Sequence, residues 1–149
     1  MPAKLLHEAN GLRVFSIVLK TGEDIMEALN AFVRAQQVAA AQITAIGAFS
    51  AAMLGYYDWA SKTYLKLPVD EQVEVAALLG DVALGEDGAP ALHLHCVLAR
   101  RDGSTKAGHL LSGTVRPTLE ILLTESPAHL RKKHDAESGL ALIDLPHSD

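Results

Sequence analysis

Two histidines one residue apart, His93 and His95, are the side chains in this sequence best spaced for chemistry, and a third, His109, follows in the next apolar run. Because an extended strand turns alternate side chains to one face, a His-x-His pair in a strand directs both imidazoles to the same point in space. Neutral imidazole binds zinc, copper, nickel or iron, and three protein ligands leave one coordination position open. The pattern therefore predicts a metal site. The alternative is that His93 and His95 form only the solvent-facing half of an amphipathic strand.

Whether His109 joins the other two histidines depends on the turn that separates the two apolar runs. Arg101-Asp-Gly103 lies between them, and a three-residue hairpin loop with glycine in the left-handed conformation is a favoured connection. This loop would pair Arg100 with Ser104. Counting back along both strands then places His95 directly opposite His109, so that three imidazoles converge.

A two-residue turn gives a different result. If Asp102-Gly103 formed the turn, the register would shift by one residue and His109 would lie on the face of Leu94 and Cys96. A bulge at Gly108 could restore the cluster. The residues alone leave both registers open.

An open coordination position could bind a metabolite, or it could lower the pKa of a bound water to about 7 and support metal-assisted hydrolysis or hydration. Turnover also needs a positioned acid or base, and the candidates are Glu74, Glu120 and either Tyr56 or Tyr57. However, a glutamate in an alternating strand usually faces water, and paired tyrosines often pack at a subunit interface. The sequence contains no Ser-His-Asp order, P-loop or Gly-x-Gly-x-x-Gly motif. It favours binding over catalysis without deciding between them.

The composition predicts a single cytoplasmic domain, 1–149, with a core over about 11–126 and a polar tail over 127–149. At 149 residues, 49% of them hydrophobic, the chain can bury a sizeable core. The net charge of −5 opposes the general attraction to phosphate that drives non-specific DNA binding. The single cysteine, Cys96, excludes an internal disulfide, fits a reducing compartment, and is predicted to be a small buried hydrophobe. No run approaches the ~20 apolar residues of a membrane span.

The elements that must position the histidines form an α+β domain, a mostly antiparallel β-sheet with one principal helix packed on it. The pattern of Leu12–Leu19 predicts a strand. A helix is predicted to follow, with Thr21 as its candidate N-cap and an apolar face that includes Leu29. Further extended segments are expected at 41–57, 63–67, 71–83, 91–100, 105–111 and 119–124.

Two basic groups are candidate DNA contacts. Arg131–His134 is the only concentrated basic run of the tail, and it is expected at the end of a short helix, where its charges favour the helix dipole and stay solvated. Arg100, Arg101 and Lys106 gather at one hairpin tip, which repetition around a trimer could turn into a multivalent surface.

Five motifs in order resemble the PPC domain, the "plants and prokaryotes conserved" domain. The resemblance covers roughly residues 11–126, and its specificity lies in the order and spacing of the motifs rather than in any one of them. The motifs are Gly22-Glu-Asp-Ile-Met-Glu-Ala-Leu29, Ala45-Ile-Gly-Ala-Phe49, His93-Leu-His95, Gly108-His-Leu110 and Gly113-Thr-Val-Arg-Pro-Thr-Leu-Glu120.

The resemblance implies an α+β fold assembled as a homotrimer, in which the three histidines gather into a site able to hold zinc in some prokaryotic members. It thereby supports the three-residue loop. It also implies an alternative function, DNA binding or transcriptional regulation, by analogy with plant relatives. Those relatives carry AT-hooks, Arg-Gly-Arg-Pro segments that insert arginine into the minor groove. This sequence has none, so it resembles the stand-alone prokaryotic type, and DNA is a doubtful partner.

Overall fold

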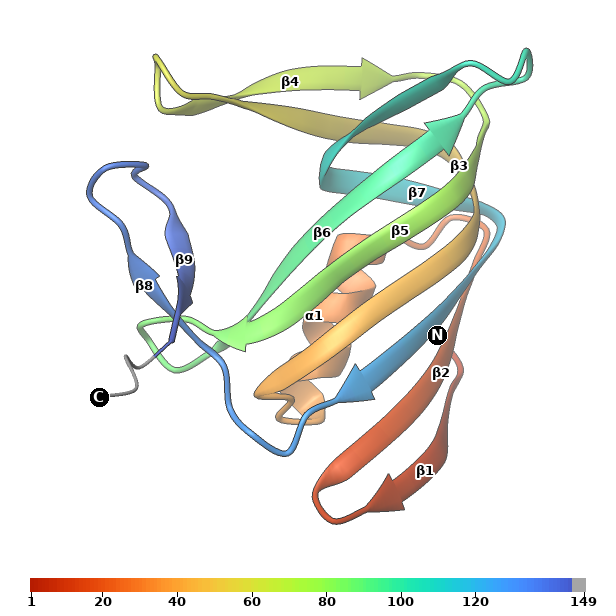
Figure 1. The fold of residues 1–149 in the computed structure, drawn as a ribbon. Helices are drawn as coiled ribbons and strands as arrows, with labels where there is room; N and C mark the ends of the chain where they lie inside the picture. The colour runs from red at the N-terminus through yellow and green to blue at the C-terminus, as the bar shows by residue number, and fades with distance from the viewer. Residues whose placement is uncertain (146–149) are drawn as a thin grey trace.

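The protein, described for residues 1–145 in a computed structural model, is built from one nine-stranded sheet and one helix that lies across it (Figure 1). The predicted α+β fold with a mostly antiparallel sheet is confirmed. The elements are β1 (Ala3–Ala9), β2 (Leu12–Lys20), α1 (Ile25–Ala35), β3 (Ala40–Asp58), β4 (Thr63–Val69), β5 (Val73–Leu84), β6 (Pro90–Ala99), β7 (Thr105–Glu125), β8 (Arg131–His134) and β9 (Ala141–Asp144).

Two long bent strands, β3 and β7, organise the sheet. The strand order is β1-β2-β7-β3-β5-β8-β9, with β4 paired to β3 and β6 paired to both β5 and β7. The first part of β7 pairs with β6 and the second part with β2, while β3 runs beside most of β7. The segments expected at 105–111 and 119–124 are therefore one continuous strand. Because β3, β5, β6 and β7 pair in a closed circuit, the histidine strand β6 is held on both edges.

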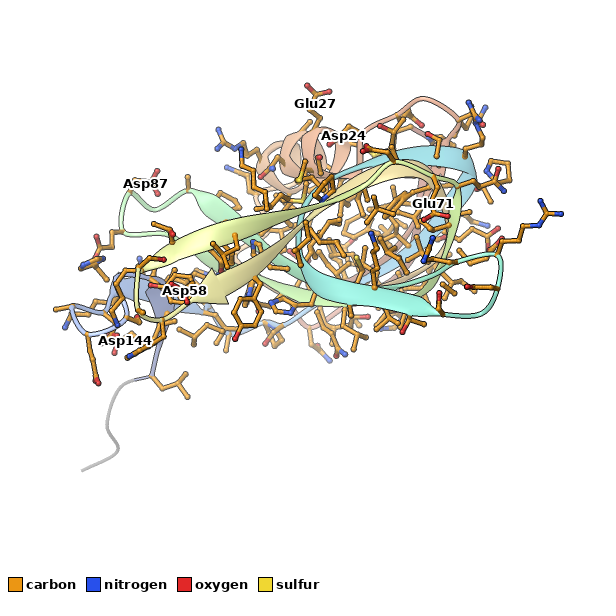
Figure 2. The ribbon with its side chains drawn as sticks, turned by 90° about the horizontal axis from the view of Figure 1, so that it is seen from above. Asp24, Glu27, Asp58, Glu71, Asp87 and Asp144 are labelled. Atoms are coloured by element: carbon orange, nitrogen blue, oxygen red, sulfur yellow. The ribbon has the colours of Figure 1, made fainter. Side chains whose placement is uncertain are left out.

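The helix starts at a different residue from the one predicted. Asp24, not Thr21, is the N-cap: its Oδ1 accepts hydrogen bonds from the backbone N–H groups of Met26 at 2.8 Å and Glu27 at 3.1 Å. Its other oxygen accepts from the N–H of Gly113 at 3.1 Å, which ties the helix start to β7. Thr21 instead donates to the carbonyl of Pro117. Figure 2 shows Asp24 and Glu27 beside the first turn.

The buried side of α1 faces the sheet at the spacing expected of an amphipathic helix. Ile25, Leu29, Phe32 and Val33 are buried, and Phe32 meets Phe15 of β2 edge-to-face with ring centroids 5.2 Å apart. Burying each such side chain contributes about 1.5–3 kcal/mol. The helix therefore fixes one face of the sheet as core and leaves the other face for the histidines. With 11 residues, this helix of the described chain is too short to cross a membrane.

The loop between β6 and β7 is the three-residue form. The N–H of Arg100 donates to the carbonyl of Ser104 at 2.8 Å, and Gly103 has φ +82°, a left-handed value that favours glycine. The resulting register places His95 directly opposite His109, as that loop predicts.

The two ends of the chain add strands that the sequence pattern did not indicate. β1 is an exposed edge strand paired with β2. The basic run Arg131–His134 forms a strand, β8, and not the end of a helix. A hydrogen bond from the N–H of Leu84 to the carbonyl of Leu130 holds the start of this strand beside β5. The expectation that all its charges stay solvated was also wrong, since the Lys132 side chain is only 9% exposed.

Candidate metal centre

Three imidazoles meet on the outer face of β6 and β7. The ring centroids of His93, His95 and His109 lie 5.0, 5.3 and 5.4 Å apart, and one nitrogen from each ring lies within 4.8 Å of the others. β6 alternates as the sequence predicted, with Leu94 and Cys96 buried in the core and the two histidines turned outward. The structure therefore brings together all three predicted ligands.

The spacing between the first two histidines suits coordination of one ion. Their Nε2 atoms are 3.2 Å apart. Two nitrogens at the usual Zn–N distance in a tetrahedral site are separated by about 3.3 Å. Little movement of these rings is needed for both to reach a single metal.

An acidic residue on the neighbouring strand orients the first histidine. Asp81 of β5 is the cross-strand partner of His93, and its Oδ2 faces the Nδ1 of His93 at 3.6 Å. The other oxygen, Oδ1, lies 3.5 Å from the Nζ of Lys132. A carboxylate behind a histidine fixes which ring nitrogen carries the proton and leaves the opposite one for a metal. Burial lowers the pKa of His93, and the Asp81 charge partly offsets this effect.

The third histidine is held by aromatic packing. The ring of Tyr64 on β4 stacks on His109 with centroids 4.7 Å apart and planes 27° apart. Gly55, the partner of His109 on β3, leaves room for this ring, because a Cβ at Gly55 would lie 2.9 Å from Tyr64 Cδ1. Burial lowers the pKa of His109 to about 4, with smaller contributions from His93 and His95. His109 is therefore neutral near pH 7, as a metal ligand must be.

An unpartnered nitrogen supports the fit to a metal. The Nδ1 of His109 is buried and has no hydrogen-bond partner within residues 1–145. A buried polar atom without a partner costs about 1–3 kcal/mol, which a coordinated ion or ordered water would offset. Three imidazoles without a thiolate suit a borderline divalent metal such as zinc.

The single cysteine takes no part in the cluster. Cys96 is 3% exposed among core leucines, and burial raises the pKa of its thiol to about 11. The sulfur is therefore an uncharged buried group, as predicted.

The two glutamates proposed as acid or base lie together, but away from the histidines. Glu74 and Glu120 line one open hollow beside Ile46. Along β5, Glu74 is five residues from Leu79, the partner of His95, which is roughly 16 Å of extended strand. The fold thus separates these carboxylates from the imidazoles.

The two tyrosines have different positions. Tyr56 is 62% exposed, whereas Tyr57 packs edge-to-face on Tyr64, with centroids 5.2 Å apart, and its hydroxyl donates to the carbonyl of Ser138. Tyr57 therefore belongs to the surroundings of His109.

Three residues around the site were not predicted from the sequence to lie there: Tyr64, Asp81 and Lys132, the last of which was considered only as part of the basic run 131–134. Asp81 had a signal, since it is the one acidic residue in the apolar run 75–84. No sequence signal places Lys132 at this site, because its contact with Asp81 depends on how the C-terminal segment runs along β5.

Comparisons with known proteins agree with this fold. The model of the Plants and Prokaryotes Conserved (PCC) domain matches residues 6–127. A metal-containing protein from Archaeoglobus fulgidus has 32% sequence identity and a TM-score of 0.81, over 89% of this chain and 93% of that one. A Ralstonia eutropha protein provisionally described as DNA-binding has 29% identity and a TM-score of 0.82, over 89% and 91%.

A curated relative places the same kind of domain within a longer chain. The bifunctional protein GlmU of a Synechococcus strain is 36% identical over 117 residues, which is 77% of this chain and 17% of that protein. The chain thus spans about a sixth of the length of the curated relatives it matches.

Proposed function

The chain belongs to the Plants and Prokaryotes Conserved domain family, and from this membership and its three-histidine cluster we propose that it is a metal-binding protein. His93, His95 and His109 bind one divalent transition metal, zinc in the first instance. The open coordination position takes a small metabolite or supports simple metal-assisted hydrolysis or hydration. The single cysteine, reduced and buried, suits the cytoplasm.

The observation that carries the proposal is the convergence of three imidazoles, one of which has a buried nitrogen with no hydrogen-bond partner among residues 1–145. When bound, the ion would supply Lewis acidity at its open position. The protein's own contribution is to hold the rings: Asp81 orients His93, and Tyr64 limits rotation of His109. The description of the Archaeoglobus fulgidus relative as metal-containing agrees with this proposal.

Metal analysis tests the proposal directly. Protein that is purified without chelator, incubated with a slight excess of zinc and desalted is expected to retain about one zinc per chain by mass spectrometry of the metal content. A metal content well below one per chain, both as purified and after zinc loading, would contradict the proposed function.

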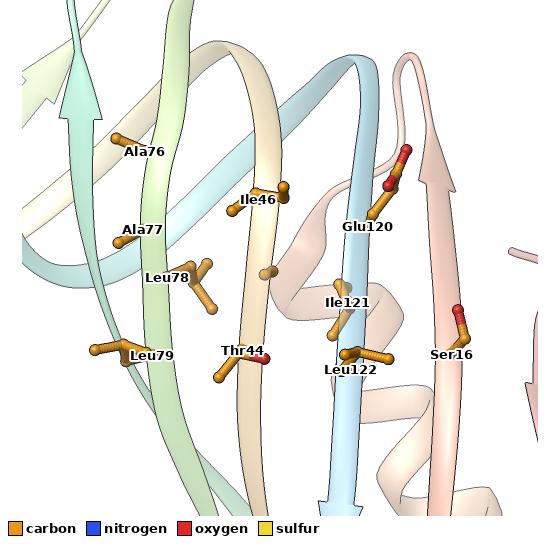
Figure 3. Close-up of a pocket in the computed structure, with 11 residues that line it drawn as sticks. Ser16, Thr44, Ile46, Ala76, Ala77, Leu78, Leu79, Glu120, Ile121 and Leu122 are labelled. Carbon is orange, nitrogen blue, oxygen red and sulfur yellow. The ribbon is translucent and has the colours of Figure 1, made fainter. Parts of the chain in front are cut away.

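We further propose that the chain assembles as a homotrimer through the outer face of the sheet. Figure 3 shows Leu79 of β5 and Leu122 of β7 on either side of Thr44 of β3, with Ile46 two residues further along β3. Ile46, Leu79 and Leu122 are 61%, 58% and 49% exposed, which is unusual for three neighbouring large apolar residues. Because Leu79 is the partner of His95, subunits packed here would border the metal site.

Light scattering tests this assembly. The parent chain of 15.9 kDa is expected to have three times this mass at micromolar concentration. Leu122→Asp is expected to give monomers, because a carboxylate at a buried interface is strongly unfavourable. Leu142→Asp on β9, an equally exposed leucine away from this face, is the control. A monomeric parent, or an L122D trimer, would contradict the proposed interface.

DNA binding is not part of the proposal. The basic group at the β6–β7 hairpin is partly neutralised, since Arg100 pairs with Glu71 at 2.7 Å and Asp102 lies within the same loop. The net charge of the chain is −5. DNA binding therefore stays an alternative that the relatives suggest and these charges do not favour.

A further inference from the structure

The C-terminal hairpin, β8 and β9, reaches the metal centre through a charged contact. Lys132 extends from β8 to the Oδ1 of Asp81 at 3.5 Å, and the other oxygen of Asp81 faces His93. The Lys132 side chain is only 9% exposed, so it does not extend freely into solvent. An ammonium in this position attracts one carboxylate oxygen of Asp81 and so holds the other oxygen toward the histidine. The hairpin thus contacts the residue that orients one ligand.

The same hairpin reaches a second ligand through an aromatic stack. Ser138, in the turn between β8 and β9, accepts a hydrogen bond from the hydroxyl of Tyr57 and is 5% exposed. Tyr57 packs on Tyr64, and Tyr64 stacks on His109. Two separate paths, one ionic and one aromatic, therefore join the hairpin to two of the three imidazoles.

Few other contacts hold the hairpin on the domain. Within residues 1–145, the other hydrogen bonds between this segment and the rest of the domain run from Leu84 N–H to the Leu130 carbonyl at 2.8 Å and from His134 N–H to Glu86 Oε1 at 3.0 Å. Most of its side chains are exposed. A segment with few buried apolar contacts opens at low free-energy cost, so a modest change at its contacts shifts its population.

We propose that the β8–β9 hairpin is a clamp whose docking is thermodynamically coupled to metal binding at His93, His95 and His109. This inference rests on the proposed metal-binding function. A bound ion draws the three rings to fixed positions, which fixes Asp81 and Tyr64 against their partners in the hairpin. In turn, a docked hairpin holds the rings ready for the ion. Lys132 and Tyr57 are positioning residues, since each acts through another side chain.

Coupling of this kind is reciprocal. If the metal favours the docked hairpin by some factor, docking must raise metal affinity by the same factor. The effect is therefore measurable from either side, at the hairpin or at the metal.

Limited proteolysis measures the hairpin side. Trypsin cleaves after the basic residues of β8, and cleavage at Arg131, Lys132 and Lys133 requires the hairpin to open. Zinc is expected to slow this cleavage at least about threefold relative to chelator-treated protein, whereas cleavage at Lys4 on the opposite edge of the sheet stays unchanged. Equal rates at β8 with and without zinc would contradict the coupling.

Zinc competition with a chromogenic chelator measures the metal side. Lys132→Met removes the ammonium and keeps the apolar stem, and Tyr57→Phe removes the bond to Ser138 and keeps the ring. Each is expected to weaken zinc affinity about 3- to 10-fold, less than the 10- to 100-fold typical of a direct partner of a ligand. Lys133→Met, the exposed neighbour on the same strand, is the control and is expected to match the parent.

The outcomes separate this inference from the function on which it rests. If the parent binds no zinc, the proposed function fails. If the parent binds zinc, and K132M and Y57F bind it as tightly with unchanged proteolysis, the clamp is wrong and the metal site stands. Circular dichroism of each variant shows whether it still folds. If a variant does not fold, the comparison of parent proteolysis with and without zinc still tests the proposal.

Discussion

A variant with alanine at both His93 and His95 is expected to lose zinc binding almost completely, with an affinity about 10⁴- to 10⁶-fold below that of the parent. Zinc sites with four protein ligands contribute about 10–16 kcal/mol, or roughly 3 kcal/mol for each ligand. Removing two of three imidazoles leaves His109 alone, and a single histidine does not bind zinc at micromolar concentration. Isothermal titration with zinc measures the change.

The matched control removes the same number of histidines elsewhere. His7 on β1 and His129 before β8 are exposed and lie outside the cluster. The His7→Ala, His129→Ala protein should bind zinc as the parent does. If the double variant at the cluster retained the zinc affinity of the parent, metal binding would have to occur elsewhere on the chain.

Gly80→Ala is expected to destabilise the protein by about 2–4 kcal/mol, the range of a strongly overpacked core position. Gly80 lies on β5 between the partners of the two β6 histidines. A Cβ there would lie 2.1 Å from the carbonyl oxygen of His93 and 2.6 Å from Leu94 Cδ2. The first clash is with backbone, so β6 must move away from β5. The same shift would displace His93 from Asp81 and weaken zinc binding about tenfold.

Urea unfolding of the metal-free protein separates this steric effect from the general effect of replacing glycine. Gly88→Ala, in the loop before β6, is the control: its φ of +76° makes alanine unfavourable by about 1 kcal/mol, and no heavy atom lies within 4 Å of its Cβ position. A G80A protein as stable as G88A would show that β5 and β6 can separate at little cost.

The histidine pair was predictable because its signal is local. The alternation of β6 follows from its sequence. The turn at Arg101–Gly103 favours the register that adds His109, although the residues alone also allowed a two-residue turn, and the structure has the three-residue form. The helix was also predictable from its apolar spacing. Its first residue was not, because Asp24 and Thr21 are both good caps. Only the contact of Asp24 with Gly113, distant in sequence, distinguishes them.

The surroundings of the metal centre depend on contacts that the sequence pattern does not encode. Tyr64 reaches His109 because β4 folds back on β3, and Lys132 reaches Asp81 because the tail turns along β5. In both cases the residue type is ordinary for its segment. A basic run is predicted to be solvated unless the fold is known to place a carboxylate of another strand beside it.

The pairing of β2 with β7 also determines how the chain can fold. Val14 lies opposite Thr124, and Arg13 forms its ion pair with Glu125, so the first strands find their partners only near the end of the sheet-forming sequence. Contacts of such large sequence separation slow folding, since the loop entropy must be overcome before they form. On the ribosome, the β1–β2 hairpin therefore waits with one edge of β2 unpaired until nearly all of β7 has emerged, whereas the β6–β7 hairpin needs only a short loop to close and align its histidines.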